Sequence, residues 1–115
     1  VAIMAFGTLI GAALTAGDAM DATVANMRFI KPLDRDLILD LAKTHDFLVT
    51  VEENSVIGGA GAEVARCLET MGVAQPLLRL GLPDQFVEHG DQAQMLAELG
   101  LDAAGMTASI RTFIS

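Results

Sequence analysis

Aromatic residues and cysteine are scarce in this sequence. It contains no Trp and no Tyr, only five Phe, and a single cysteine, Cys67. One cysteine excludes an internal disulfide and fits a reducing compartment, so we expect a cytoplasmic protein. Cys67 lies on the apolar face of a predicted helix, which favours a buried structural thiol over a nucleophile.

Positive charge is also scarce. Seven Lys and Arg stand against fifteen Asp and Glu, which gives a net charge of −8. Nucleic acids and anionic membranes bind to basic surfaces, so we expect neither as a partner. No apolar run approaches the roughly 20 residues that a membrane-spanning helix needs.

The common catalytic and nucleotide-binding motifs are missing. The sequence contains no GxGxxG, no GxxxxGK[ST] and no GxSxG. His45 and His89 have no cysteine or second histidine nearby in sequence, so we expect no metal site. His45 follows a predicted helix, where a structural or solvated role is favoured. From the residues alone we therefore assign no catalytic, cofactor-binding or metal-ligating residue.

The best-specified stretch covers residues 47–71 and has the pattern of a strand, a glycine-rich turn and a helix. The apolar run at 47–51 is typical of a buried strand. The apolar residues after the turn recur at the spacing of one helical face: Val64, Cys67, Leu68 and Met71. The turn contains Gly58, Gly59 and Gly61. We interpret these glycines as allowing a tight turn and close helix-on-sheet contact, with direct ligand contact as the alternative.

The same patterns predict the remaining elements. Strands are expected at 1–6, 22–29 and 76–80, a turn at 81–84, and helices near 9–17, 34–44, 91–99 and 102–113. The predicted helix caps are Thr8, Asp34, Asp91 and Asp102 at N-termini and Gly72 at a C-terminus. We expect residues 1–115 to form a single domain, a three-layer α/β/α fold whose mainly parallel four-stranded sheet has the order 2-1-3-4. A crevice would then lie beyond the carboxyl ends of strands 1 and 3, near Gly7, Thr8 and residues 52–54.

Several polar residues at the predicted strand ends are candidates for contacts with a neighbouring domain. Charged groups in otherwise apolar segments need partners, so we expect an interface at Arg28, Lys31, Asp34, Glu52, Glu53 and Asn54. Because adjacent residues of a strand point to opposite faces, Glu52 and Glu53 do not form a carboxylate pair for acid–base catalysis.

Four segments carry a family resemblance: MRFIKPLD at 27–34, VEENSVIGGAG at 51–61, GLPDQF at 81–86 and ELGLDAAGM at 98–106. The first two resemble the C-terminal domain of transketolase-type thiamine diphosphate enzymes, and more loosely the beta subunits of 2-oxo acid dehydrogenases. The last two are most similar to the 1-deoxy-D-xylulose-5-phosphate synthase family. Together they cover the chain in the right order.

The resemblance implies a cytoplasmic homodimeric transferase that uses thiamine diphosphate and Mg²⁺. The family condenses pyruvate with glyceraldehyde 3-phosphate, with loss of CO₂, for isoprenoid, thiamine and pyridoxal synthesis. Its cofactors bind to the N-terminal and central domains, and the GDG diphosphate motif is absent from these 115 residues. The resemblance therefore implies a structural and dimerisation role for this domain, with no cofactor of its own and no activity in isolation.

Two alternatives stay open from the sequence. The chain resembles domains of other transketolase-like and 2-oxo acid dehydrogenase enzymes, or it is a free-standing flavodoxin-like binding module with a ligand near Gly7 and Glu52. Because residue Val1 lies within a predicted strand, we expect a fragment of a longer polypeptide. The family also has an antiparallel strand before this position, and a fragment lacking that strand would have an exposed sheet edge.

Overall fold

A parallel sheet forms the centre of the molecule. The computed structural model describes residues 1–27, 34–55, 59–82 and 100–115. The strands in this part are β1 (Ala2–Ala5), β2 (Thr23–Asn26), β3 (Leu48–Ser55) and β4 (Leu77–Leu82). They pair in the order β2-β1-β3-β4, and all three pairings are parallel. The predicted strand order and direction are confirmed.

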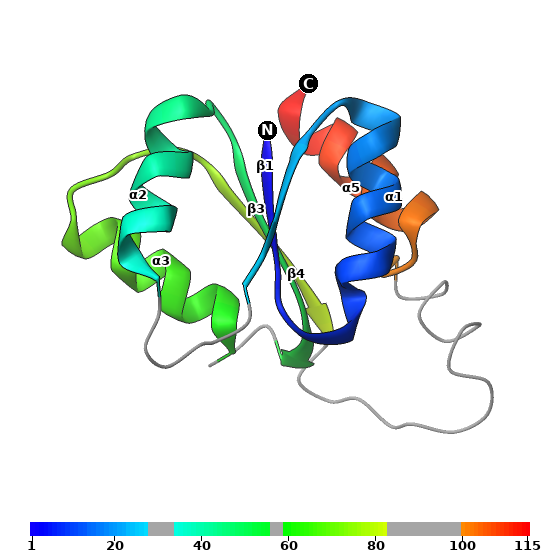
Figure 1. The fold of residues 1–115 in the computed structure, drawn as a ribbon, viewed down its shortest axis with the longest axis horizontal. Coiled ribbons are helices and arrows are strands. Elements are labelled where there is room, and N and C mark those ends of the chain that lie inside the picture. Colours follow the sequence, from blue (N-terminus) through cyan, green and yellow to red (C-terminus); the bar gives the residue numbers. More distant parts are fainter. Residues whose placement is uncertain (28–33, 56–58, 83–99) are drawn as a thin grey trace.

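Helices cover both faces of the sheet. A 3₁₀ turn, η1 (Gly7–Leu9), leads into α1 (Ile10–Met20), and the other described helices are α2 (Arg35–Thr44), α3 (Ala60–Thr70) and α5 (Ala103–Ile114). Figure 1 shows α2 and α3 on one side of the sheet and α1 and α5 on the other. This is the predicted three-layer α/β/α arrangement.

The central strands divide their side chains between two cores. In β1, Ala2 and Met4 belong to the core under α2 and α3, whereas Ile3 and Ala5 belong to the core under α1 and α5. This alternation follows from the two-residue period of a strand. All four residues are fully buried, as expected for a parallel strand covered on both faces.

Three of the predicted helix caps are confirmed. The Asp34 carboxylate accepts a hydrogen bond from the Leu37 amide at 3.1 Å, and the Asp102 carboxylate accepts one from the Gly105 amide at 2.8 Å. Gly72 follows α3 with a φ of +72°, and the next amide donates to the Leu68 carbonyl. This is the left-handed ending that favours glycine.

The predicted cap at Thr8 is wrong. Gly7 has a φ of +80°, which turns the chain sharply after β1, and Gly7–Leu9 then form the 3₁₀ turn. Leu9 therefore precedes α1, and no side chain caps that helix.

Element ends differ from prediction by a few residues. The β3 strand continues to Ser55, beyond the predicted end at 51, and β4 includes Gly81, which was predicted to turn. The two strands extend together, because Ser55 pairs with Leu82 across a register shift. The β2 strand ends at Asn26. The predicted helix at 91–99, with its cap Asp91, and His89 lie outside the described residues.

None of the described helices is long and apolar enough to cross a membrane.

Candidate functional site

A buried carboxylate lies close to where the crevice was predicted, in the second half of β3. The Glu52 side chain is 2% exposed, and its Oε2 accepts a hydrogen bond from the Gly61 amide at 2.5 Å. Gly61 is in the first turn of α3, where amides lack partners within the helix. Glu52 therefore binds the N-terminus of α3 to the sheet, and its negative charge suits the helix dipole.

Thr50 and Arg79 complete this site. They are partners in the parallel register of β3 and β4, and both lie against Gly61. A Cβ atom on Gly61 would lie 2.8 Å from Thr50 Oγ1 and 3.2 Å from Arg79 Cδ. Only glycine fits there without a shift of its neighbours, so our interpretation of the turn glycines is confirmed for Gly61 as close helix-on-sheet contact. Gly59 precedes α3 in an extended conformation, and Gly58 lies outside the described residues.

Two polar atoms of the site have no hydrogen-bond partner among the described residues. They are Thr50 Oγ1 and Glu52 Oε1, and both are buried. A buried polar atom without a partner costs about 1–3 kcal/mol, so such atoms are rare in folded proteins. These two atoms mark a position where a hydrogen-bond donor would stabilise the protein.

Burial raises the pKa of the Glu52 carboxyl above its ordinary value of 4.5. Loss of hydration is the largest cause, since water no longer stabilises the charged form. The hydrogen bond from Gly61, the positive charge of Arg79 and a hydrogen bond from Ala60 act in the opposite direction but do not cancel it. Glu52 therefore holds its proton more tightly than an exposed glutamate does.

Glu52 acts here as a hydrogen-bonding group. The described residues form no complete catalytic arrangement around it. In this part of the chain, no group of three or more His, Cys, Asp or Glu residues is placed to hold a metal ion. Cys67 is buried on α3, as predicted. His45 joins the end of α2 to β2, because its Nδ1 lies 3.0 Å from the Leu41 carbonyl and its Nε2 lies 2.9 Å from Thr23 Oγ1.

The six predicted interface residues are only partly described. Asp34 is exposed and caps α2, and Glu52 is buried at the α3 terminus. Glu53 and Asn54 belong to β3, and only their backbone is described. Arg28 and Lys31 lie outside the described residues.

Two residues of the site, Thr50 and Arg79, were not singled out from the sequence. Arg79 gave a usable signal, because it is the one charged residue in the otherwise apolar segment PLLRL at 76–80. Thr50 gave none, since threonine is common in strands.

Comparison with known proteins shows what this chain resembles. Residues 1–106 match the family described as transketolase, C-terminal domain. The chain is 60% identical over 111 residues to the 1-deoxy-D-xylulose-5-phosphate synthase of Dechloromonas aromatica and 62% identical over 111 residues to that of Bordetella petrii. Each match covers 96% of this chain but only 18% of the relative, so the chain spans less than a fifth of those proteins.

A solved structure supports the same assignment of the fold. A split gene transketolase, described as an inactive beta4 tetramer, superposes with a TM-score of 0.84 at 33% sequence identity. The match covers 96% of this chain and 37% of the transketolase chain.

Proposed function

Because this chain belongs to the transketolase C-terminal domain family, we propose that it is the C-terminal domain of a 1-deoxy-D-xylulose-5-phosphate synthase. The observation that carries the proposal is the difference in identity: 60–62% to two synthases against 33% to the split gene transketolase, each over 96% of this chain. This difference favours a synthase over another transketolase-like enzyme, and the extended match disfavours a free-standing flavodoxin-like module.

The proposed parent enzyme condenses pyruvate with glyceraldehyde 3-phosphate and releases CO₂, forming a precursor of isoprenoids, thiamine and pyridoxal. It is a cytoplasmic homodimer that depends on thiamine diphosphate and Mg²⁺. The cofactor supplies the carbanion chemistry, and the protein supplies binding and orientation.

The described residues do not fit the cofactor's diphosphate. The Gly61 amide at the start of α3, which would be the natural donor to a phosphate, is already occupied by the Glu52 carboxylate. A second anion at this position would be repelled by Glu52 when that group is ionised. We therefore derive no catalytic step through this domain, and propose that it binds no cofactor.

In this proposal the domain is structural and supports dimerisation. Its partners are the N-terminal and central domains of the same polypeptide, and the six candidate contacts remain Arg28, Lys31, Asp34, Glu52, Glu53 and Asn54. Glu52 is the best supported of them, because its Oε1 has no donor among the described residues.

Two measurements test the proposal. The full-length protein should form 1-deoxy-D-xylulose 5-phosphate from pyruvate and glyceraldehyde 3-phosphate, with release of CO₂. A protein that instead transfers two-carbon units between sugar phosphates would be a transketolase, and the proposed activity would be wrong. In calorimetry, the 115-residue chain should bind no thiamine diphosphate, and saturable micromolar binding would contradict the structural role.

A further inference from the structure

The outer face of α1 and α5 is nearly free of charge. The exposed residues of α1 follow the spacing of one helical face: Gly11, Leu14, Thr15, Asp18 and Ala19. Those of α5 are Ala104, Ala108, Arg111, Thr112 and Ile114. We call these ten residues the α1–α5 face. Only Asp18 and Arg111 among them are charged.

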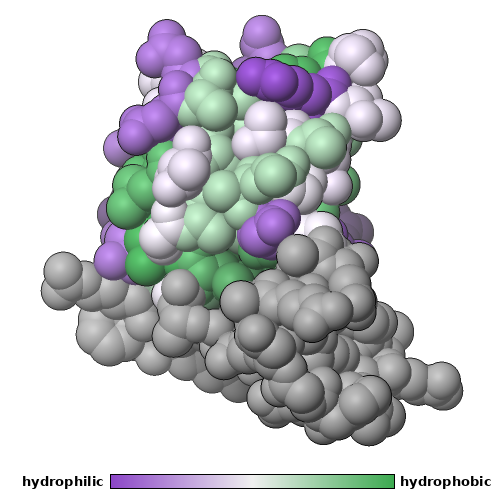
Figure 2. Space-filling view, turned by 90° about the vertical axis from the view of Figure 1, so that its right-hand side faces the viewer, coloured by the Kyte–Doolittle hydropathy of each residue, from purple (hydrophilic) through white to green (hydrophobic). Residues whose placement is uncertain are grey.

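The α1–α5 face also holds the large exposed hydrophobic side chains of the described residues. They are Leu14, which is 50% exposed, and Ile114, which is 37% exposed. Figure 2 shows this side of the molecule, with hydrophobic and neutral residues over the middle and hydrophilic residues gathered mainly at the margins. A contiguous apolar area on a protein surface is typical of an interaction site.

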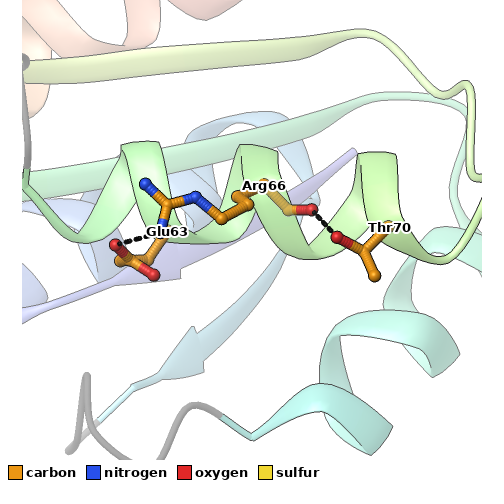
Figure 3. A network of polar contacts seen from close by, with 3 residues as sticks. All are labelled: Glu63, Arg66 and Thr70. Carbon is orange, nitrogen blue, oxygen red and sulfur yellow. Dashed lines mark hydrogen bonds and ion pairs between the residues drawn. The ribbon is translucent and has the colours of Figure 1, made fainter.

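The opposite helix layer has a very different outer surface. α2 carries Arg35, Asp36, Asp40 and Lys43, and α3 carries Glu63, Arg66 and Glu69. Figure 3 shows Glu63 and Arg66 paired along α3, with Thr70 one turn further on. The α2–α3 surface is therefore suited to water, whereas the α1–α5 face has the charge-poor composition of an interface core.

Val1 lies on the same side of the sheet as the α1–α5 face. The Val1 side chain packs against the core under α1 and α5, and Figure 1 places both chain ends at the same end of the molecule, near the end of α5. The matched synthases devote only 18% of their length to the region that this chain covers. In the proposed enzyme, a large preceding segment would thus join this domain near the C-terminal end of α5.

We propose that the α1–α5 face docks against the preceding domain of the same polypeptide. This inference rests on the proposed function, since it requires that the chain is the last domain of a longer enzyme. It adds a second contact surface, on the helices, to the predicted contacts at the strand ends. A second copy of the chain is the less favoured occupant, because Val1, where the preceding segment would join, lies on the same side of the sheet as this face.

Hydroxyl-radical footprinting of the full-length protein tests this proposal with an internal control. Leu14 on α1 is more exposed than Leu39 on α2, so an uncovered α1–α5 face would make Leu14 the faster of the two to be oxidised. If the preceding domain covers this face, Leu14 should react more slowly than Leu39 by about threefold or more, since interface-core side chains are largely shielded from water. Faster oxidation of Leu14 would overturn the proposal.

Dilution separates the two possible occupants. Protection of Leu14 that persists when the enzyme is diluted to monomers supports docking within one polypeptide, and protection that disappears would assign the face to a second copy and overturn the proposal. Synthase activity of the same preparation reports on the proposed function independently, because an active enzyme with a rapidly oxidised Leu14 would refute only the docking surface.

A pair of variants supplies a second test. Leu14→Glu and Thr70→Glu each add one negative charge at an exposed helical position, the first on the α1–α5 face and the second on α3. In the full-length protein, Leu14→Glu should increase the rate of proteolysis in the segment before Val1 by roughly tenfold, as a charge buried in an apolar contact weakens docking. Thr70→Glu should leave that rate unchanged, and equal rates for the two variants would contradict the proposal.

Discussion

The α2–α3 layer and the α1–α5 layer cover opposite faces of one sheet, yet they are built in different ways. The α2–α3 layer is strongly amphipathic, with charged residues outside and large apolar residues such as Ile38 and Leu68 inside. The α1–α5 layer has small residues on both sides of α1, including buried Ala13 and Ala16. The comparison shows that packing against the sheet does not determine the composition of the outer face of a helix.

The two layers also contact the sheet differently. Beneath α3 lies the polar site of Thr50 and Glu52, held by a hydrogen bond to Gly61. Beneath α1 the contact depends on close approach, since a Cβ on Gly17 would lie 2.5 Å from Val24 Cγ2. Both layers therefore contain a glycine in close contact with the sheet, and the α2–α3 layer adds a polar interaction at that contact.

The largest expected effect tests a close backbone contact within the α1–α5 layer, at the start of α5. A Cβ at Gly105 would lie 2.5 Å from Gly100 Cα, a backbone atom that cannot move aside. Gly105→Ala should therefore lower the free energy of unfolding by roughly 3 kcal/mol, measured by urea denaturation of the chain. Gly11→Ala is the matched control in α1, where no atom lies within 4 Å. Gly11→Ala should stabilise the chain by about 0.5 kcal/mol. Equal changes in the free energy of unfolding for the two variants would show that the close backbone contact at Gly105 does not determine the cost of the substitution.

A smaller effect tests the polar site of the α2–α3 layer. Glu52→Ala removes the acceptor for the Gly61 amide and leaves that buried donor unpaired. The free energy of unfolding should fall by about 2 kcal/mol. Thr50→Val provides the contrast, because it removes a buried hydroxyl that has no partner among the described residues. It should be neutral or stabilising, and a loss as large as that of Glu52→Ala would show that the hydroxyl is satisfied.

The pH dependence of stability should differ between the chain and Glu52→Gln. The pKa of Glu52 is raised in the folded state, so the native protein binds more protons than the unfolded one at pH values between 4.5 and the raised pKa. The contribution of Glu52 to stability is therefore complete below pH 4.5 and is lost as the pH rises through the folded-state pKa. Relative to Glu52→Gln, the chain should become less stable across this window in urea denaturation at a series of pH values. A difference that is constant, or that grows with pH, would contradict the burial of an ionisable carboxyl.

The smallest effect is expected on the charged outer surface of α3. Arg66 Nη1 lies 3.3 Å from Glu63 Oε1, but the two side chains are 72% and 33% exposed, so solvent screens the pair. Arg66→Ala should change the free energy of unfolding by no more than about 0.5 kcal/mol. A larger loss in thermal or urea denaturation would mean that the outer charges stabilise the fold directly rather than serving to keep this surface in water.

The architecture could be predicted from sequence because its signals are local. Apolar runs identified the buried strands, and short connections with right-handed crossovers gave the order 2-1-3-4. Asp34, Asp102 and Gly72 were predicted as caps because each acts on backbone groups only a few residues away. The prediction of a cap at Thr8 was wrong because a 3₁₀ turn begins at Gly7 and moves the start of α1 to Ile10.

The candidate site could be predicted only in part, because it depends on contacts between distant residues. Glu52 and Glu53 are neighbours of the same type, and the sequence does not say which of them the sheet buries. The position of Arg79 beside Thr50 depends on the register of β4 against β3. That register depends on how β4 packs beside β3, so neither segment read alone places Arg79 next to Thr50.

The buried thiol of Cys67 can report on local opening of the structure around α3. It is the one sulfhydryl among the 115 residues, and at 4% exposure it is shielded on the buried face of α3. A thiol-specific reagent in solution will reach this sulfur only when the helix lifts from the strands. The rate at which the thiol reacts with such a reagent therefore reports how often α3 separates from the sheet. No label has to be introduced for this measurement.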